Sequence, residues 1–381
     1  MDLLLAFGII VIASVVIMYA CDGFDDAASY LGRNMAPGVR GATINAIGSS
    51  MPELMTTLFL LFLFHDRDGF AAGVATTVGS AIFNIVVIPM LCIFAVRYRG
   101  IIVAGSGNIA HAVRQRITQV GITKRGLARD GVFLLTAQVV LVWILGNTVM
   151  TWWMGGALLM IYGVYFVFLA SGFGAGSDEH GTDRAGNGAG ESSSESPSNL
   201  KAILTFDFNH LIYNGRPYTT GSAWVALSLA TMVIGIACWQ LAEAVMWSAD
   251  ALGVPAYFTA LIFAAAATSI PDTVLSVKDA MRGEYDDAIS NAVGSNTFDI
   301  TVGIGLPVLL YTLLFGSVQV MSVDQTQVLR IVLFAVTAVV LGAFLLRKHV
   351  TVATAYFLLI IYLGWMGFVF HDMASAMQGA G

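Results

Sequence analysis

Acidic and hydroxyl side chains stand three or four residues apart in two motifs of the first half of the chain. The motif GSSMPEL contains Ser49, Ser50 and Glu53, and the motif VGSAIFNI contains Ser80 and Asn84. Residues at these spacings share one face of a helix, so each motif presents several oxygen atoms on one side. Carboxylate, amide and hydroxyl oxygens gathered in this way are suited to binding a hard cation.

The same pattern recurs in the second half of the chain. ATSIPDT contains Thr268, Ser269 and Asp272, and VGSNTFDI contains Ser295 and Asp299. The acid of the first motif precedes the serine of the second by 27 residues in the first half and by 23 residues in the second half. Four helices are therefore expected to contribute matching polar side chains to one site.

Backbone oxygens add to this set. Pro52 and Pro271 have no N–H to donate to the carbonyl four residues earlier, which frees the carbonyls of Gly48 and Ala267. Calcium takes about six to eight oxygen ligands, and sodium is also a hard cation that accepts hydroxyl and carbonyl oxygens. The pattern contains no His or Cys, which argues against zinc, copper or iron.

Structural roles compete with this interpretation to different degrees. A lone intramembrane hydroxyl usually forms a hydrogen bond within its own helix. An Asp or Glu at the centre of a membrane helix costs at least about 2.5–3.5 kcal/mol, so such acids are functional candidates. No intramembrane Lys or Arg matches Glu53, Asp272 and Asp299 in the sequence, so cations or protons must neutralise them.

Four further acids in apolar segments have two interpretations. Asp22, Asp25, Asp26 and Glu243 are candidates for the lining of an ion access path. They fit equally well as acids in a wet vestibule or as protonated, hydrogen-bonded side chains. The sequence does not decide between these roles.

The composition predicts a membrane protein. The 381 residues are 57% hydrophobic and 11% charged, with a mean hydropathy of +0.79, whereas soluble domains are about a quarter charged. A hydrocarbon layer about 30 Å thick needs about 20 apolar residues per helix, and ten such segments predict an all-α polytopic fold. They are residues 2–31, 40–64, 70–96, 131–149, 154–173, 222–250, 256–280, 286–315, 326–346 and 350–370.

Basic residues fall into alternate loops, which predicts the orientation of the chain. Cytoplasmic loops of membrane proteins are enriched in Lys and Arg, so these loops are placed in the cytoplasm and both termini outside. The stretch from His111 to Arg129 is either part of this bias or a basic segment on the inner leaflet. The basic residues of these loops are Arg33, Arg40, Arg97, Arg99, Arg114, Arg116, Lys124, Arg125, Arg129, Arg184, Lys201, Arg216, Lys278, Arg282, Arg347 and Lys348.

A polar segment divides the chain into two repeats. Residues 174–199 have the Gly, Ser and acidic composition of a disordered linker, within a cytoplasmic connection at 174–221. The five-helix repeats on either side, 1–173 and 222–381, carry their polar motifs within 41–90 and 264–307, respectively. The hairpin between the two motifs is outside in the first repeat and inside in the second, so the repeats are inverted. Inverted repeats with broken helices are typical of a transporter.

The two motif pairs resemble the repeats of the sodium/calcium exchangers in the cation/calcium exchanger superfamily. The resemblance implies that the family's ion ligands carry over to Ser49, Ser50, Glu53, Ser80, Asn84, Thr268, Ser269, Asp272, Ser295 and Asp299, together with the carbonyls of Gly48 and Ala267. It also implies that the first and sixth helices slide across a core formed by the second, third, seventh and eighth. Two departures, Ala267 for the usual Gly and Ala81 where some members have Asn, remove no carboxylate.

These observations predict a secondary antiporter that exchanges sodium for calcium by alternating access. A calcium/proton antiporter is less consistent with the hydroxyl-rich motifs, and potassium co-transport is a further variant because Asp299 also resembles the potassium-dependent members. A cation channel and an intramembrane protease are the alternatives from other classes, and the inverted repeats favour a carrier. The expected partners are calcium, sodium and the lipid bilayer of a plasma or inner membrane, with no enzymatic activity, no prosthetic group and no nucleic acid. A monomer is expected to suffice.

Overall fold

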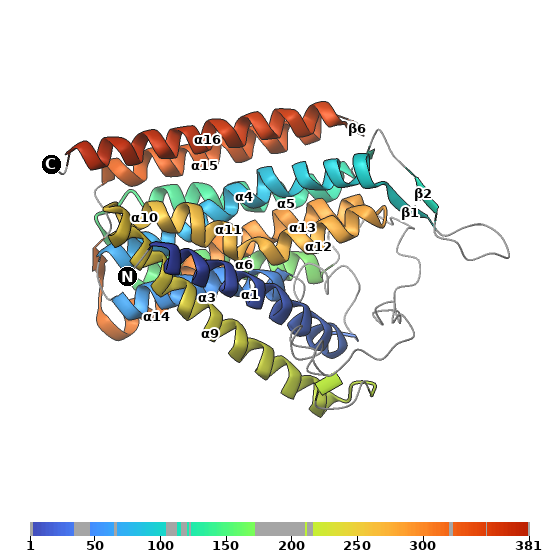
Figure 1. The fold of residues 1–381 in the computed structure, drawn as a ribbon, viewed down its shortest axis with the longest axis horizontal. Coiled ribbons are helices and arrows are strands. Elements are labelled where there is room, and N and C mark those ends of the chain that lie inside the picture. The colour runs from blue at the N-terminus through green and yellow to red at the C-terminus, as the bar shows by residue number, and fades with distance from the viewer. Residues whose placement is uncertain are drawn as a thin grey trace.

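The described part of the chain is almost entirely helical. The structure, a computed structural model, describes residues 3–33, 46–64, 67–103, 113–115, 120–121, 123–171, 210–211, 216–319, 323–347 and 349–379. Its long helices run roughly along one common direction, and the two ends of the chain lie at the same end of the bundle (Figure 1). The predicted linker at 174–199 and most of the predicted basic stretch before Thr123 lie outside the described residues.

The helices agree with the predicted all-α fold class. In chain order they are α1 (Leu3–Leu31), α3 (Ala46–Phe64), α4 (Arg67–Arg99), α5 (Lys124–Ile144), α6 (Trp152–Ala170), α9 (Thr220–Leu252), α10 (Ala256–Thr259), the π-helical η2 (Ala260–Ala264), α11 (Ala265–Thr268), α12 (Ile270–Met281), α13 (Tyr285–Phe298), the π-helical η3 (Asp299–Gly303), α14 (Ile304–Phe315), α15 (Val323–Leu346) and α16 (Val352–Gly379).

Among the described residues, nine helical spans are long and apolar enough to cross a membrane. A tenth is obtained when Ala256–Thr268 and Ile270–Met281, which bend by 41° at their junction, are counted as one broken span. The ten predicted segments are each represented, which confirms the membrane-spanning fold class.

Two predicted boundaries were wrong because tertiary contacts extend the helices. The fourth segment was predicted to start at residue 131, but α5 begins at Lys124, after Thr123 donates to Asp286 on α13 from both its N–H (2.6 Å) and its hydroxyl (2.5 Å). The tenth was predicted to end at residue 370, but α16 continues to Gly379. Its polar end includes Asp372, which accepts a hydrogen bond of 3.0 Å from the Tyr257 hydroxyl.

Strand pairs and helix packing repeat between the two halves of the chain. β3 (Val120–Gly121) pairs antiparallel with β6 (His349–Val350), and β4 (Val149–Met150) pairs antiparallel with β5 (Val318–Gln319). The first pair lies beside the start of α5 and the end of α15, and the second beside the end of α5 and the start of α15. These two helices therefore pack antiparallel. In a matching pair of contacts, α6 packs on α14 and α16 packs on α4.

α4 and α13 cross at the centre of the bundle. The Asn296 amide on α13 donates a 2.8 Å hydrogen bond to the Ala81 carbonyl on α4, and both residues are fully buried. Ala81 and Asn296 hold equivalent positions in VGSAIFNI and VGSNTFDI. A contact between equivalent residues places the local symmetry axis of the two halves at this crossing.

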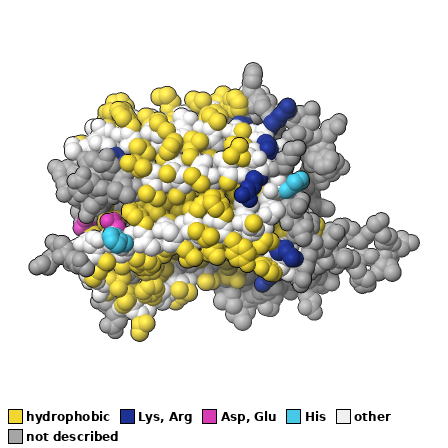
Figure 2. All heavy atoms as spheres, turned by 90° about the horizontal axis from the view of Figure 1, so that it is seen from above, with side chains coloured by type: hydrophobic (Ala, Val, Ile, Leu, Met, Phe, Trp, Pro, Cys, Tyr) yellow, Lys and Arg dark blue, Asp and Glu magenta, His cyan; other side chains and the backbone are white. Residues whose placement is uncertain are grey.

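The surface has the distribution of a protein embedded in a bilayer. Hydrophobic side chains cover the middle of the face in Figure 2, and the visible Lys and Arg side chains gather toward one end. That is the end of the bundle that carries the hairpin of β1 (Ile101–Val103) and β2 (Val113–Gln115) (Figure 1). The described part of the chain is therefore an integral membrane protein with unequal charge at its two ends.

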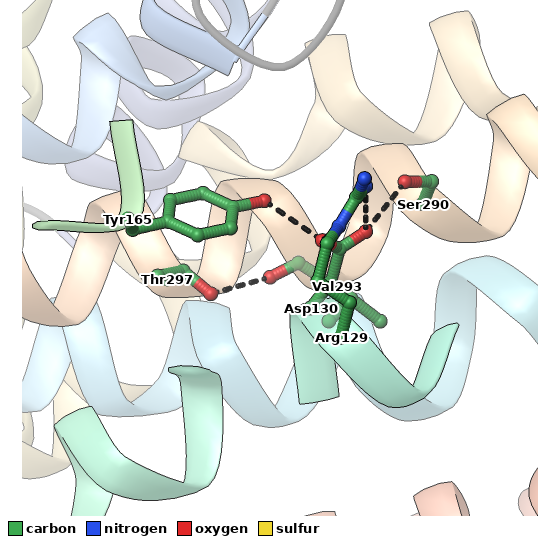
Figure 3. A network of polar contacts seen from close by, with 6 residues as sticks. All are labelled: Arg129, Asp130, Tyr165, Ser290, Val293 and Thr297. Atoms are coloured by element: carbon green, nitrogen blue, oxygen red, sulfur yellow. Dashed lines mark hydrogen bonds and ion pairs between the residues drawn. The ribbon is translucent and has the colours of Figure 1, made fainter. Parts of the chain in front are cut away.

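A buried carboxylate anchors α13 to its neighbours (Figure 3). Asp130 on α5 is 1% exposed and accepts hydrogen bonds from Arg129 Nε (2.7 Å), the Tyr165 hydroxyl of α6 (3.2 Å) and the Ser290 hydroxyl of α13 (3.0 Å). The guanidinium balances the charge, and the two hydroxyls satisfy the remaining lone pairs, as a buried ion pair requires. Three helices are thereby fixed at one end of α13.

Replacing Asp130 with alanine is expected to destabilise the protein. Tyr165 and Ser290 lose their acceptor and Arg129 loses its counter-charge, so the free energy of unfolding should fall by about 1.5–3 kcal/mol. SDS-induced unfolding of the purified protein in detergent measures this change. Asp250→Ala, at an exposed position on α9, is the control. Equal stabilities of the two variants would contradict the anchoring role.

Candidate cation-binding site

The ten predicted side-chain ligands are buried where α3, α4, α11–α12 and α13–η3 meet. Each of them is at most 2% exposed: Ser49, Ser50, Glu53, Ser80, Asn84, Thr268, Ser269, Asp272, Ser295 and Asp299. All are linked by the contacts described below, so the structure brings the complete set together in one cluster. Their role as cation ligands and that of the Gly48 and Ala267 carbonyls stay predictions.

Three carboxylates form the centre of this cluster. Glu53, Asp272 and Asp299 each present an oxygen atom that lies within 4.8 Å of those of the other two. Among the described residues these three acids lie close enough together that they could hold a metal ion. Oxygens at this separation fit around one hard cation, since calcium–oxygen distances are about 2.3–2.6 Å.

Hydroxyl and amide groups connect the two halves of the site. Ser80 Oγ lies 3.0 Å from Glu53 Oε1, to which it donates, and 2.9 Å from Ser269 Oγ. Asn84 Nδ2 donates to Asp272 Oδ2 at 3.1 Å. The Ser80–Ser269 and Asn84–Asp272 contacts join the first half to the second half, so neither half forms the site alone.

A second group of hydroxyls surrounds Asp272. Ser295 Oγ donates to Asp272 Oδ1 at 2.8 Å and lies 3.1 Å from Ser50 Oγ and 3.3 Å from Ser49 Oγ. Thr268 donates to the Ala265 carbonyl of its own helix at 3.3 Å and interacts with Glu53 as well. Ser295 and Thr268 thus contact carboxylates directly, and Thr268 also forms the intrahelical bond expected of a structural hydroxyl.

Three buried oxygen atoms of the site have no hydrogen-bond donor among the described residues. They are Glu53 Oε2, Asp299 Oδ1 and Asn84 Oδ1. A buried acceptor without a partner costs free energy, and a buried carboxylate oxygen costs more than a neutral one. The same three atoms are available to a cation, which would remove this cost.

The backbone of the second half is irregular at the site. The helix breaks at Ser269, between α11 and α12, and a π-helical turn begins at Asp299. In the first half, α3 runs through Pro52 and α4 runs through Asn84 without a break. The predicted interruption is therefore confirmed beside Pro271, whereas α3 continues through Pro52, where the proline removes only one intrahelical hydrogen bond.

Two polar pairs next to the site were not predicted. Thr57 Oγ1 lies 3.1 Å from Thr77 Oγ1 in the first half, and Asn291 Nδ2 donates to Ser276 Oγ at 3.1 Å in the second half. Thr57 and Ser276 stand four residues after Glu53 and Asp272. Extending the helical spacing by one turn in the sequence would have found both.

The four ambiguous acids have different surroundings. Glu243 on α9 accepts a 2.7 Å hydrogen bond from Trp239 Nε1 on the same helix, which fits the structural alternative. Asp22 on α1 lies 3.6 Å from Lys278 on α12. Asp25 Oδ1 is buried without a hydrogen-bond donor among the described residues. These acids therefore do not share one role.

Comparison with protein families gives a match over most of the chain. The sequence profile described as sodium/calcium exchanger protein matches residues 5–170 and 222–371. Among curated proteins, sodium/potassium/calcium exchanger Nckx30C of Drosophila melanogaster is 34% identical over 126 residues, which are 32% of this chain and 14% of that protein. Sodium/potassium/calcium exchanger 4 of Mus musculus is 32% identical over 170 residues, which are 42% of this chain and 27% of that protein. The matched segments span less than a third of either relative's length.

Solved structures share the fold. A crystal structure of the H+/Ca2+ exchanger CAX superposes with a TM-score of 0.69 at 14% identity, covering 98% of this chain and 85% of that one. The sodium-calcium exchanger NCX_Mj superposes with a TM-score of 0.55 at 17% identity, covering 96% of this chain and 99% of that one. At these identities the superpositions establish the arrangement of helices alone.

Gly79 allows the helices of the site to approach each other. A Cβ atom at this position would overlap the Leu261 carbonyl oxygen and lie 2.7 Å from Ala265 Cβ. The absence of a side chain lets α4 lie against η2 and α11, next to the contact between Ser80 and Ser269.

We predict that Gly79→Ala separates these helices. Overpacking of this kind costs about 1–3 kcal/mol, so SDS-induced unfolding should start at a lower SDS fraction than in the wild type. Gly163→Ala on α6, where an added Cβ meets nothing within 4 Å, is the matched control. A Gly79→Ala protein as stable as this control would show that the close approach is not required.

Proposed function

The chain belongs to the sodium/calcium exchanger family, and we propose that it exchanges sodium for calcium across a membrane. The observation that supports this proposal most directly is the cluster of Glu53, Asp272 and Asp299, buried in the bundle with unpartnered oxygens. The ion pairs observed among the described residues involve other acids. Cations are therefore the charges best able to neutralise the three carboxylates. The cluster is thus the proposed binding site of the transported ions.

Competition for shared oxygens explains how the two ions would be coupled. A calcium ion binds several carboxylate oxygens at once. Sodium ions that need the same oxygens therefore cannot occupy all of their own positions while calcium is bound. A site emptied of both ions leaves the carboxylates repelling one another at short range. The conformational change that moves the site from one side of the membrane to the other is thereby disfavoured when the site is empty. This is the condition for exchange.

α1 and α9 are the helices proposed to move. They pack along each other more extensively than along any other helix, and both contact α3 at the edge of the site. The helices that hold the ligands are instead tied together by the hydrogen bonds of Ser80 and Asn84. Sliding of the α1–α9 pair across this fixed core would open the site to one side of the membrane and close it to the other.

The orientation and domain organisation are part of the proposal. The end of the bundle with the Lys and Arg side chains (Figure 2) faces the cytoplasm, and both termini lie outside. Residues 1–173 and 222–381 form the inverted repeats, joined by a cytoplasmic linker at 174–221. The membrane is a plasma or inner membrane, and a monomer suffices because both halves of the site come from one chain.

Calcium-45 uptake into sodium-loaded proteoliposomes tests the proposed exchange. Uptake should be driven by outward sodium flow, and Glu53→Gln should reduce it to the level of protein-free vesicles because a central carboxylate is lost. Asp68→Asn, at an exposed acid in the first turn of α4, is the control. Calcium uptake that requires a proton gradient and does not depend on sodium would establish the calcium/proton antiporter instead.

Potassium co-transport is a second candidate, which two observations favour. The curated relatives described above are sodium/potassium/calcium exchangers. In addition, Asp299 supplies a carboxylate where the first repeat has the Asn84 amide, so the site has one more negative charge than a symmetric one. An additional monovalent cation would balance that charge.

If potassium is co-transported, sodium-driven calcium uptake should rise when potassium is present on the calcium side, and Asp299→Asn should abolish that rise. The measurement is calcium-45 uptake at fixed sodium with potassium or choline as the second cation. Asp68→Asn, at an exposed acid in the first turn of α4, removes a charge away from the site and serves as the control. Uptake independent of potassium in the wild type would eliminate this variant of the function.

A further inference from the structure

A second group of acids lies on α1, outside the cluster of Glu53, Asp272 and Asp299. Asp22, Asp25 and Asp26 occupy the last third of the helix, toward the end of the bundle that carries the β1–β2 hairpin (Figure 1). Asp22 and Asp26 are exposed, whereas Asp25 is partly covered and its Oδ1 atom is buried. The three acids therefore extend from the surface of the bundle toward its interior.

Asp25 reaches the first residue of a ligand motif. A Cβ atom added to Gly48 would overlap Asp25 Oδ1 and lie 3.3 Å from Asp25 Cγ. The carboxylate thus lies directly on the Gly48 backbone, one residue before Ser49. Any other residue at position 48 would displace it.

The charges around Asp25 leave it without a full counter-charge. Asp22, Asp26 and Asp272 are acids near it, and Lys278 is the nearby base. The Lys278 amine lies 3.6 Å from Asp22 Oδ1, and both side chains are about half exposed. Among the described residues, Asp25 therefore shares this lysine with Asp22.

A buried carboxylate oxygen needs a donor or a cation. Asp25 Oδ1 has no hydrogen-bond donor among the described residues, and leaving such an atom unpaired is costly. Glu243 on α9, by contrast, accepts a hydrogen bond from Trp239. The difference between these two acids points to a ligand at Asp25.

We propose that Asp25 forms a second cation site, at which calcium binds on its way between the cytoplasm and the central cluster. The inference rests on the proposed exchange function and adds a binding step to it. Asp25 supplies the carboxylate, and water completes the coordination shell. Because one carboxylate replaces the three of the central cluster, the site holds calcium more weakly and releases it inward or outward.

Sided transport measurements test this step. Asp25→Asn should raise by about tenfold the calcium concentration needed for half-maximal uptake when calcium is presented at the end of the protein with the basic loops, since a ligand charge is lost. The maximal rate and the affinity at the opposite side should stay unchanged. Asp26→Asn is the matched control, because it removes the same charge from the neighbouring, exposed residue.

Two outcomes would overturn the proposal. One is an unchanged calcium dependence in Asp25→Asn, which would make the acid a structural one. The other is an equal shift in Asp26→Asn, which would reduce the effect to general surface charge. If Asp25→Asn does not yield a monodisperse protein, Asp25→Ser removes the carboxylate with a smaller polar side chain and should give the same one-sided shift.

Equilibrium binding separates this proposal from the exchange function. Calcium-45 binding to the purified wild type in detergent should show a weaker component that Asp25→Asn removes and Asp26→Asn retains. That component would persist as a binding site even if sodium fails to drive uptake, in which case the exchange function alone falls. Sodium-driven uptake with no Asp25-dependent binding component would instead remove the second site and keep the exchanger.

Discussion

The repulsion among Glu53, Asp272 and Asp299 governs how the helices around them are built. Two unit charges about 4 Å apart repel by about 4 kcal/mol at an effective dielectric constant of 20, and oxygens of these three acids lie within 4.8 Å of one another. Ser80, Asn84 and Ser295 donate hydrogen bonds that stabilise the carboxylates without neutralising them. The remaining charge has to be removed by protons or, as proposed above, by a bound cation, which would couple the stability of the core to the occupancy of the site.

Hydrogen bonds between the two halves of the chain limit which helices are free to move. Ser80 of the first half contacts Ser269 of the second, and Asn84 contacts Asp272 in the same way. Displacing one half against the other would break these bonds and expose buried donors and acceptors, each at a cost of about 1–3 kcal/mol. The Asp130 network adds a further restraint on α13 (Figure 3). Motion is cheaper at the α1–α9 pair, which lies outside this hydrogen-bonded core.

The sequence predicted the clustering of these polar side chains better than their surroundings because the cluster follows from local spacing. Ser49, Ser50 and Glu53 share a helix face wherever that helix packs, and the repeat in the second half indicated that the two faces meet. The contact of Asn296 with Ala81, the bend at Ser269 and the approach of Asp25 to Gly48 depend on how separate helices pack. No spacing rule contains that information, and the same holds for the early start of α5, which Asp286 on α13 stabilises.

The two repeats are alike in shape and unlike in charge, and this difference has a structural counterpart. Asn84 lies within a regular α-helix, whereas its equivalent, Asp299, begins the π-helical turn η3. A π-turn inserts an extra residue into a helix and redirects the side chains and carbonyls at that point, which is why such turns recur at functional sites. The Asn84 amide lies 3.5 Å from Asp299 Oδ2, so the donor of one repeat faces the acid of the other across the symmetry axis. The symmetric frame thus brings the ligands together, and the departure from symmetry gives the site its additional negative charge.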